Sequence, residues 1–127
     1  MPSPSDLRFS DSHEWFRLEG DVVTIGISQF AADELTDITY VELKDQGTEI
    51  GENETIGEVE SVKTTSDIYS VVGGEIIEVN PAPQDDPSLL NRDPFGDGWL
   101  VRIRTGNPAP LENLLDQTAY DEKYPVG

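Results

Sequence analysis

The chain contains three lysines, and one of them, Lys63, stands where a β-hairpin would turn. It falls between the runs 55–62 and 68–72, which are rich in β-branched residues and therefore predict two neighbouring strands. A lysine on a rigid turn exposes its amine, and enzymatic acylation requires an exposed amine on a well-defined backbone. The pattern therefore predicts that Lys63 is a site of covalent modification.

The other residue types exclude several kinds of site. The chain has no cysteine, so it has no disulfide, thiolate metal site or cysteine nucleophile, and sulfur chemistry must come from an attached group. Its single histidine, His13, cannot build a catalytic triad or a multi-histidine metal site. The acidic loop 93–97 fails the calcium-loop pattern, because Phe95 and Arg104 stand where oxygen ligands belong. We expect no metal site. A glycosidase-like pair of carboxylates stays open, because acids are abundant.

Acidic residues dominate the chain, with 26 Asp and Glu against 8 Lys and Arg, a formal net charge of −18. Phosphate repulsion makes nucleic acid an unfavourable partner for such a surface. The charge fits a carrier that docks onto basic surfaces of larger enzymes, and it fits simple solubility or adaptation to high salt equally well. The first six residues lack a signal-peptide pattern and no run reaches membrane-spanning length, so we expect a cytoplasmic protein without a membrane partner.

Many short strands, separated by frequent turn signals, account for most of the chain. We expect strands at 7–9 (a short edge strand), 13–18, 22–27, 38–43, 48–50, 55–62, 65–72, 75–79 and 99–104. Ser28 is a good N-cap for a short helix at 29–35, and Asp116 caps a helix at 117–124 after a shorter one at 110–115. The proline-rich segment 80–87 predicts a loop, with a helical turn at 87–90 and a second loop at 93–98.

This order of elements is typical of a mainly β fold, a small β-sandwich or flattened barrel with a short helix after the first hairpin and short C-terminal helices. The length suits one domain, 1–127, and no change of composition marks a second. We expect a flexible N-terminus over about 1–6, a helical extension over about 105–127, and a monomer.

A series of short segments, taken in order, is far more specific than any one of them. The segments are Ser12–Trp15, Gly26-Ile27, Tyr40–Leu43, Glu60–Lys63, Ser66-Asp67, Gly74–Asn80 and Asp93–Leu100. In this order they resemble the H proteins of the glycine cleavage system, a family of lipoyl carriers, over nearly the whole chain. The resemblance implies the lipoyl-domain fold, a barrel-sandwich hybrid.

Lys63 is the lipoylated residue by this resemblance, joined to lipoic acid through an amide that removes the lysine charge. Biotin carriers also display a lysine on a hairpin, but methionine normally flanks it in those families. Here Val62 and Thr64 flank the lysine, and the only methionine is Met1, which disfavours biotin.

Three further residues are implied to help the modifying enzyme recognise the fold: Gly47, Glu60 and Gly74. The two glycines lie before and after Lys63 at a spacing similar to that of lipoyl carriers. Glycine permits turns that other residues resist, so both are also expected as ordinary turn residues.

The resemblance also implies a surface cleft near Ser12, Glu14 and Asp67 that receives the loaded arm. Carboxylates suit such a cleft, because the aminomethyl cargo carries a cationic amine. Glu34 occupies a position where some members carry a histidine, and we include it among the cleft residues. The alternative for each acid is an ordinary solvated side chain.

Some positions depart from the family pattern. Val71 and Gly73 stand where proline and serine are typical, and Gln29 stands where aspartate is common. Thr36 replaces a common glycine after the first helix, which puts a left-handed helix end there in doubt. These changes concern loop geometry rather than Lys63.

The implied function is that of a non-catalytic carrier of the glycine cleavage system. A pyridoxal-phosphate glycine decarboxylase would load the lipoyl arm with the aminomethyl group of glycine. A tetrahydrofolate-dependent aminomethyltransferase would remove this group, and an FAD-dependent dihydrolipoamide dehydrogenase would restore the disulfide. A lipoate-attaching enzyme is the fourth implied partner. The alternatives are a lipoyl relay that donates lipoate to other enzymes, or an unmodified adaptor of the same fold.

Overall fold

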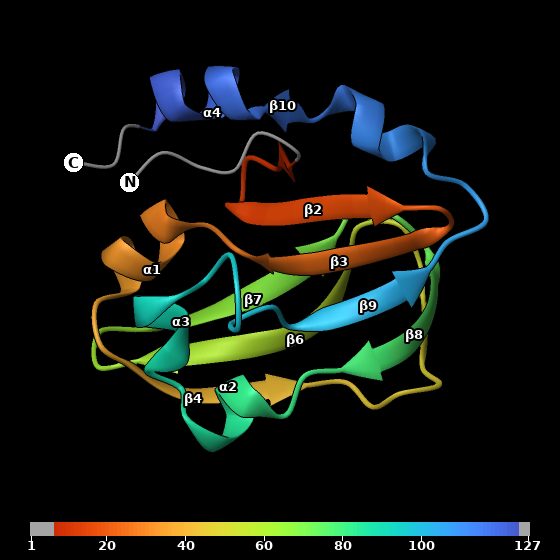
Figure 1. Cartoon of the computed structure of the whole chain (residues 1–127). Helices are drawn as coiled ribbons and strands as arrows, with labels where there is room; N and C mark the ends of the chain where they lie inside the picture. The colour runs from red at the N-terminus through yellow and green to blue at the C-terminus, as the bar shows by residue number, and fades with distance from the viewer. Residues whose placement is uncertain (1–6, 125–127) are drawn as a thin grey trace.

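Two antiparallel β-sheets pack face to face in the computed structural model, which describes residues 7–124 (Figure 1). The larger sheet has the strand order β10-β1-β2-β3-β9-β8-β5, and the smaller has the order β4-β6-β7. The predicted mainly β sandwich with short helices is therefore confirmed. The predicted flexible N-terminus, residues 1–6, lies outside the described residues.

Short elements follow one another closely along the chain. The strands are β1 Arg8–Phe9, β2 Glu14–Glu19, β3 Val22–Ile27, β4 Ile38–Leu43, β5 Glu49–Ile50, β6 Glu54–Ser61, β7 Thr65–Ser70, β8 Gly74–Val79, β9 Val101–Arg104 and β10 Leu115–Asp116. The helices are α1 Gln29–Leu35, α2 Ala82–Asp85, α3 Leu89–Arg92, the 3-10 helix η1 Ala109–Asn113 and α4 Gln117–Lys123. The long antiparallel pairs β2–β3 and β6–β7 are hairpins, as the sequence predicts.

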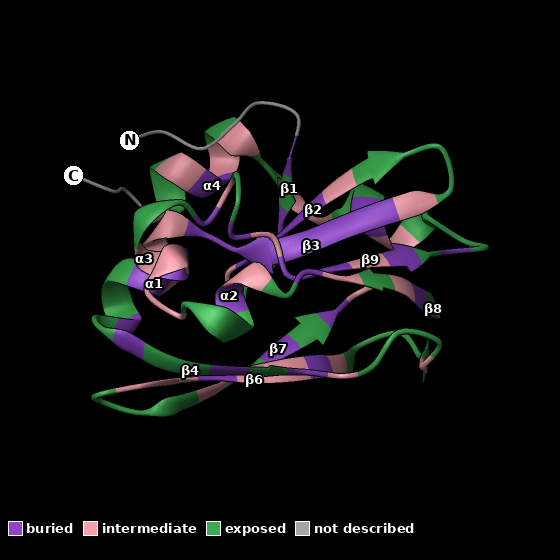
Figure 2. Ribbon diagram, turned by 60° about the horizontal axis from the view of Figure 1, so that its bottom comes forward, coloured by how far each residue is buried: buried purple, intermediate pink, exposed green. Residues whose placement is uncertain are grey.

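The core fills the space between the two sheets and is built from aliphatic side chains of both. Strand β3 lies at its centre and is buried along nearly its whole length (Figure 2). A second cluster is mostly aromatic and joins β1 and α4 to the sandwich, with Phe9, Trp15 and Tyr120 almost fully buried in it. The first cluster fixes the two sheets, and the second fixes α4 against β1 and β2.

Capping residues behave as the sequence predicts. The Ser28 hydroxyl accepts a hydrogen bond from the Ala31 N–H at the start of α1, and the Asp116 carboxylate accepts one from the Ala119 N–H at the start of α4. Each side chain satisfies an N–H that the helix leaves without a partner. These two short helices therefore begin at the predicted residues.

Three predictions about the elements are wrong in detail. The segment 80–87 contains the helical turn α2, because prolines at the start of a helix occupy positions whose N–H groups need no helical partner. Strand β1 is not an edge, since β10 pairs with it inside the predicted helical extension. The helical turn expected at 87–90 is α3 at Leu89–Arg92, two residues later.

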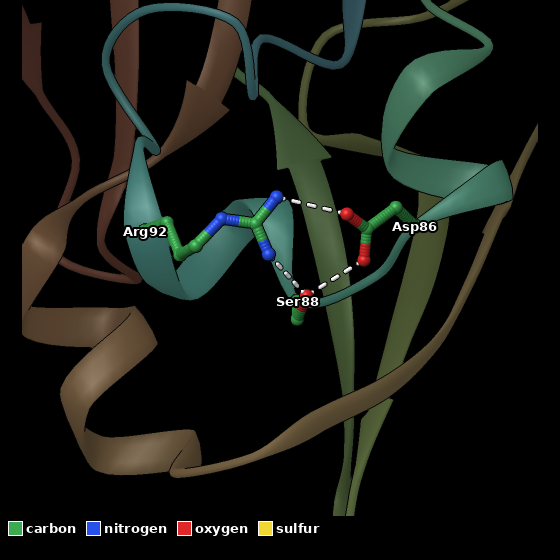
Figure 3. Close-up of polar contacts among 3 residues, drawn as sticks. All are labelled: Asp86, Ser88 and Arg92. Atoms are coloured by element: carbon green, nitrogen blue, oxygen red, sulfur yellow. Dashed lines mark hydrogen bonds and ion pairs between the residues drawn. The ribbon is translucent and has the colours of Figure 1, made fainter.

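A polar contact holds the turns α2 and α3 together (Figure 3). The Arg92 guanidinium donates to the Asp86 carboxylate at 2.8 Å and to the Ser88 hydroxyl, which itself donates to Asp86 at 2.6 Å. The Ser88 hydrogen bond, followed by Arg92, lowers the pKa of Asp86 below its ordinary value. All three groups are accessible to water, so the contact shapes the segment more than it stabilises the protein.

The residue after α1 has an unusual backbone. Thr36 has φ 61° and ψ −134°, so the positive φ that glycine adopts easily is kept although the residue is β-branched. Its hydroxyl donates to the Leu35 carbonyl at 2.6 Å. The ψ value lies outside the left-handed helical region, so the helix does not end in that conformation, and the sequence-based doubt about it is confirmed. The positive φ nevertheless makes Thr36 a strained residue.

We expect the variant Thr36→Gly to raise the free energy of unfolding by about 1 kcal/mol, because relief of strain exceeds the entropy that glycine adds to the unfolded chain. The matched control is Thr65→Gly in β7, which removes the same side chain from strand backbone in regular register with Glu60 and should lower stability by about 1 kcal/mol. Chemical denaturation measures both. Equal losses in the two variants would show that Thr36 is not strained.

Candidate functional site

Lys63 lies at the tip of the β6–β7 hairpin, exposed to solvent. The turn is closed by the Ser61 N–H, which donates to the Thr64 carbonyl at 2.8 Å. The Ser61 hydroxyl oxygen also accepts hydrogen bonds from the N–H groups of Lys63 and Thr64, each at 3.1 Å. The side chain is therefore presented on a backbone held by hydrogen bonds on both of its sides.

The hairpin tip rests on the segment that joins α1 to β4. The Val62 N–H donates to the Asp37 carbonyl at 3.1 Å, and the Lys63 Nζ donates to the Glu34 carbonyl at 3.3 Å. The second contact places a cation at the C-terminal end of α1, where carbonyl oxygens lack helical partners. The lysine thus lies against a carbonyl oxygen rather than a carboxylate.

Asn91 of α3 fixes that supporting segment. Its side-chain oxygen accepts a hydrogen bond from the Ile38 N–H at 3.0 Å, and its amide nitrogen donates to the Thr36 carbonyl at 2.5 Å and the Ala32 carbonyl at 3.4 Å. A chain of contacts therefore runs from α3 through the α1–β4 segment to the tip that carries Lys63. The sequence analysis missed Asn91, because nothing in the local pattern marks an asparagine that bonds residues more than fifty positions away.

Glu14 is buried, with 1% of its surface exposed, and its carboxylate joins the two sheets. One oxygen accepts hydrogen bonds from the Ser10 hydroxyl and, at 2.5 Å, from the Ser12 hydroxyl. The other accepts the Tyr69 N–H at 3.0 Å from the open edge of β7. Both oxygens are already engaged, so Glu14 is neither a solvated acid nor free to bind cargo without a rearrangement.

His13 belongs to a polar chain that reaches α4. Its Nδ1 lies 2.9 Å from the Tyr120 hydroxyl, which lies 2.7 Å from the Ser28 hydroxyl at the start of α1. Rings of Phe30 and Tyr124 pack on the imidazole at centroid distances of 4.7 and 4.6 Å. Burial raises the pKa of Tyr120 to about 12, although the Ser28 hydrogen bond opposes the shift. The C-terminal helix is thereby tied to the Ser12–Glu14 element.

The two remaining acids of the predicted cleft lie apart from Glu14. Asp67 is exposed on the outer face of the small sheet, where it is paired in register with Glu58. Glu34 is exposed on α1, and its backbone carbonyl contacts Lys63. The structure thus brings Ser12 to Glu14 and Glu34 to Lys63, but it does not gather all four residues around one point.

The three predicted recognition residues separate into two places. Glu60 lies on β6 beside the tip, in register with Thr65 of β7. Gly47 lies in the β4–β5 connection and Gly74 is the first residue of β8, both at the opposite end of the sandwich, which Figure 1 shows on the right. Gly47 has φ 92°, and a Cβ on Gly74 would lie 2.1 Å from the Arg104 carbonyl oxygen. Both glycines are required by the fold itself.

Two further searches concern other classes of function. Within residues 7–124, no helix is long and apolar enough to span a membrane. Over the same residues, His, Asp and Glu side chains form no group of three or more that could hold a metal ion.

Comparisons with known proteins all lead to one family. The family model described as "Glycine cleavage H-protein" matches residues 7–125. A glycine cleavage system H protein of Symbiobacterium thermophilum is 48% identical over 93% of this chain and 92% of its own length. A probable one of Haloarcula marismortui is 46% identical over 94% of each chain. The crystal structure of such a protein from Mycobacterium marinum superposes with a TM-score of 0.88 at 34% identity, covering 98% of this chain and 100% of that one.

We expect Asn91→Ala to lower the free energy of unfolding by about 2 kcal/mol, because the Ile38 N–H and the Thr36 carbonyl lose their partner. Amide exchange at Val62 should also become faster, since its acceptor lies in the loosened segment. The control is Asn113→Ala, at an exposed position, with a change within about 0.5 kcal/mol. Unchanged stability and exchange in Asn91→Ala would contradict the supporting role.

A pH dependence follows from His13. Burial lowers its pKa below the unfolded value of 6.5, although the charges of Glu14, Glu34 and Asp11 oppose this and Lys123 adds to it. The unfolded chain therefore binds the proton more readily, so the contribution to stability is complete above pH 6.5 and is lost as the pH falls through the folded pKa.

Thermal unfolding at about pH 7.5 and about pH 5.5 measures this effect, because most carboxylates stay ionised in that range. We expect the melting temperature of the natural chain to be lower at about pH 5.5 than at about pH 7.5, and this decrease to be smaller in His13→Asn. Asparagine does not titrate, and it tolerates the φ of 72° at this position. An identical decrease in both proteins would remove His13 as the cause.

Proposed function

The chain belongs to the glycine cleavage H-protein family, a family of carrier subunits rather than enzymes, and on that premise we propose that it carries a lipoyl group on Lys63. The observation that carries the proposal is the presentation of Lys63: an exposed amine on a turn fixed by the Ser61 hydroxyl and supported by Asp37. Such a backbone lets a modifying enzyme find the amine in one defined position.

The surroundings of Lys63 fit the loss of its charge on acylation. The ammonium donates to the neutral Glu34 carbonyl, so an amide at Nζ leaves no carboxylate without its ion-pair partner. The amide also keeps one N–H, which can continue to donate to the same oxygen. Attachment joins the Lys63 nitrogen to an activated lipoyl carboxyl group, such as an acyl adenylate, and releases the activating group and a proton.

When attached, a lipoyl group would supply a disulfide ring that can be opened by the aminomethyl group of glycine. The dithiol left after the group is passed on would be oxidised back to the disulfide by the dihydrolipoamide dehydrogenase, whose FAD would accept the two electrons. The chain supplies display and docking to three enzymes: the pyridoxal-phosphate glycine decarboxylase, the tetrahydrofolate-dependent aminomethyltransferase and the FAD-dependent dihydrolipoamide dehydrogenase. A shuttle needs modest affinity for each, and long-range attraction by an acidic surface speeds encounter without tight binding. The proposal places the carrier in the cytoplasm with these enzymes.

The predicted cleft residues take different parts in this proposal. Glu34 and Asp67 are exposed, so each can accept a hydrogen bond from the cationic amine of the cargo. Glu14 is buried and holds Ser12 and the edge of β7, so we assign these two residues to shaping the cleft wall.

Replacement of each lysine in turn tests the attachment site. We expect Lys63→Arg to abolish lipoylation and glycine cleavage, because the guanidinium is not acylated, while the fold is retained. The matched controls are Lys44→Arg and Lys123→Arg, the other two lysines of the chain, which should be lipoylated normally. Intact mass and peptide mass of protein from native cells report the adduct. An adduct on another lysine, or glycine cleavage by the Lys63→Arg protein, would overturn the proposal.

A further inference from the structure

The outer face of the small sheet carries three carboxylates in one row. Strand pairing aligns Glu42 of β4 with Glu58 of β6, and Glu58 with Asp67 of β7. Their strand neighbours are buried in the core, so the carboxylates point outward; these neighbours are Val41, Val59 and Ile68. In Figure 2 these strands form the lowest layer of the molecule, and their outer face is directed to solvent. We call Glu42, Glu58 and Asp67 the acidic row.

Stability does not account for the acidic row. Strands β4, β6 and β7 contain neither lysine nor arginine, and their acids are Glu42, Glu54, Glu58, Glu60 and Asp67. Among the ion pairs within residues 7–124, Lys44 pairs with Glu54, and none reaches the row. Like charges directly opposite each other on neighbouring strands are destabilising.

The strands of the large sheet, in contrast, carry arginines. Arg17 lies on β2, and Arg102 and Arg104 lie on β9, where the latter two pair with Glu78 and Asp21. On the large sheet Arg102 and Arg104 thus offset acids, whereas Lys44, which lies next to β4, pairs with Glu54 and leaves the acidic row without an ion pair among those found in residues 7–124. This asymmetry is more specific than the acidity of the chain as a whole.

Two tyrosines accompany the carboxylates on the same face. Tyr40 is 46% exposed and Tyr69 is 39% exposed, and tyrosine is enriched where proteins bind one another. A groove of about 540 Å³ crosses the face, and its lining includes all three carboxylates of the row, Asp45 and one cation, Lys44, which pairs with Glu54. The pKa of Tyr40 is raised above its ordinary value, mainly by the adjacent Glu42 carboxylate, which reflects the negative potential of the face.

The row lies close to Lys63 along the same hairpin. Glu58 is three residues from the end of β6, so the row is about 10 Å along the strand from the turn. An unmodified lysine extends only by its four methylene groups. An enzyme that acts on the bare ε-amine must therefore bring its active site onto the tip, and its body then covers the neighbouring part of the hairpin.

We propose that the acidic row is the docking surface for an arginine- and lysine-bearing surface of the enzyme that attaches the lipoyl group to Lys63. The inference rests on the proposed function, since it concerns the enzyme that modifies this lysine. The enzymes that act on the lipoylated protein receive a longer arm, because the lipoyl group extends the lysine side chain. Their active sites can therefore lie farther from the hairpin tip, and they have less need to cover the acidic row. A basic partner neutralises the row that the folded chain leaves unbalanced.

The test uses the unmodified full-length chain and a purified lipoate-attaching enzyme. The variant Glu42→Gln/Glu58→Gln/Asp67→Asn neutralises the row with nearly isosteric side chains. The control Glu19→Gln/Glu112→Gln/Glu122→Gln changes the net charge equally at exposed positions on β2, η1 and α4. No aminomethyl cargo is present in this assay, so a role of Asp67 towards cargo does not contribute.

For the row variant we expect kcat/KM of lipoyl attachment to fall by about tenfold or more, with a weaker dependence on salt. The row variant should also melt at a higher temperature than the natural chain, because like-charge repulsion is removed, so misfolding does not explain a slow reaction. The control should react within about twofold of the natural chain, since its charges lie outside the docking surface. Mass spectrometry should locate the adduct at Lys63 in all three proteins after long incubation.

Two results would overturn the inference while the proposed function stands: equal rates for the row variant and the control, or a row variant that is lipoylated normally but fails with the glycine decarboxylase. Failure of the natural chain to be lipoylated at Lys63 would instead refute the proposed function itself.

Discussion

A buried carboxylate joins the two sheets of this protein, and the shape of its functional end depends on that contact. Removal of the Glu14 charge from water is costly unless its oxygens are satisfied by hydrogen bonds. Hydroxyls of Ser10 and Ser12 satisfy one oxygen, and the edge N–H of Tyr69 satisfies the other. If strand β7 moved away from β2, the Glu14 carboxylate would lose the Tyr69 N–H while still buried. This cost holds β7 and β2 in one relative position.

The display of Lys63 depends on contacts far from it in the sequence. Its turn is local, but the turn rests on Asp37, and Asn91 fixes the segment on both sides of that residue. The strained backbone of Thr36 lies in the same segment. Strain at a single residue persists only where neighbouring contacts hold it, and here helix α3 supplies them.

The distribution of charge separates the roles of the two sheets. On the large sheet Arg102 and Arg104 pair with acids, whereas the small sheet holds Glu42, Glu58 and Asp67 opposite one another. The general acidity of the chain is sufficient for solubility, but it does not require like charges in cross-strand register. The register therefore lowers the stability of the fold while it concentrates negative potential beside the hairpin that carries Lys63.

Much of the site was predictable from the sequence, because it depends on local patterns. The hairpin around Lys63, the caps Ser28 and Asp116 and the short helices that they begin are all set by neighbouring residues, and the structure has them where they are expected. Helix α2 was mispredicted, because prolines that disfavour a helix interior are tolerated in its first turn. Strand β10 was missed, because two residues carry no strand pattern without the partner β1.

The sequence by itself determined that one lysine is displayed on a hairpin and that no cysteine, catalytic triad or multi-histidine metal site accompanies it, because these follow from residue type and spacing. The tertiary structure decided which acids are buried and which are exposed. Glu14 is enclosed between the sheets, whereas Asp67 lies on the outer face in register with Glu58. Strand register and the packing of the two sheets are long-range properties, so residue type and local spacing do not contain them.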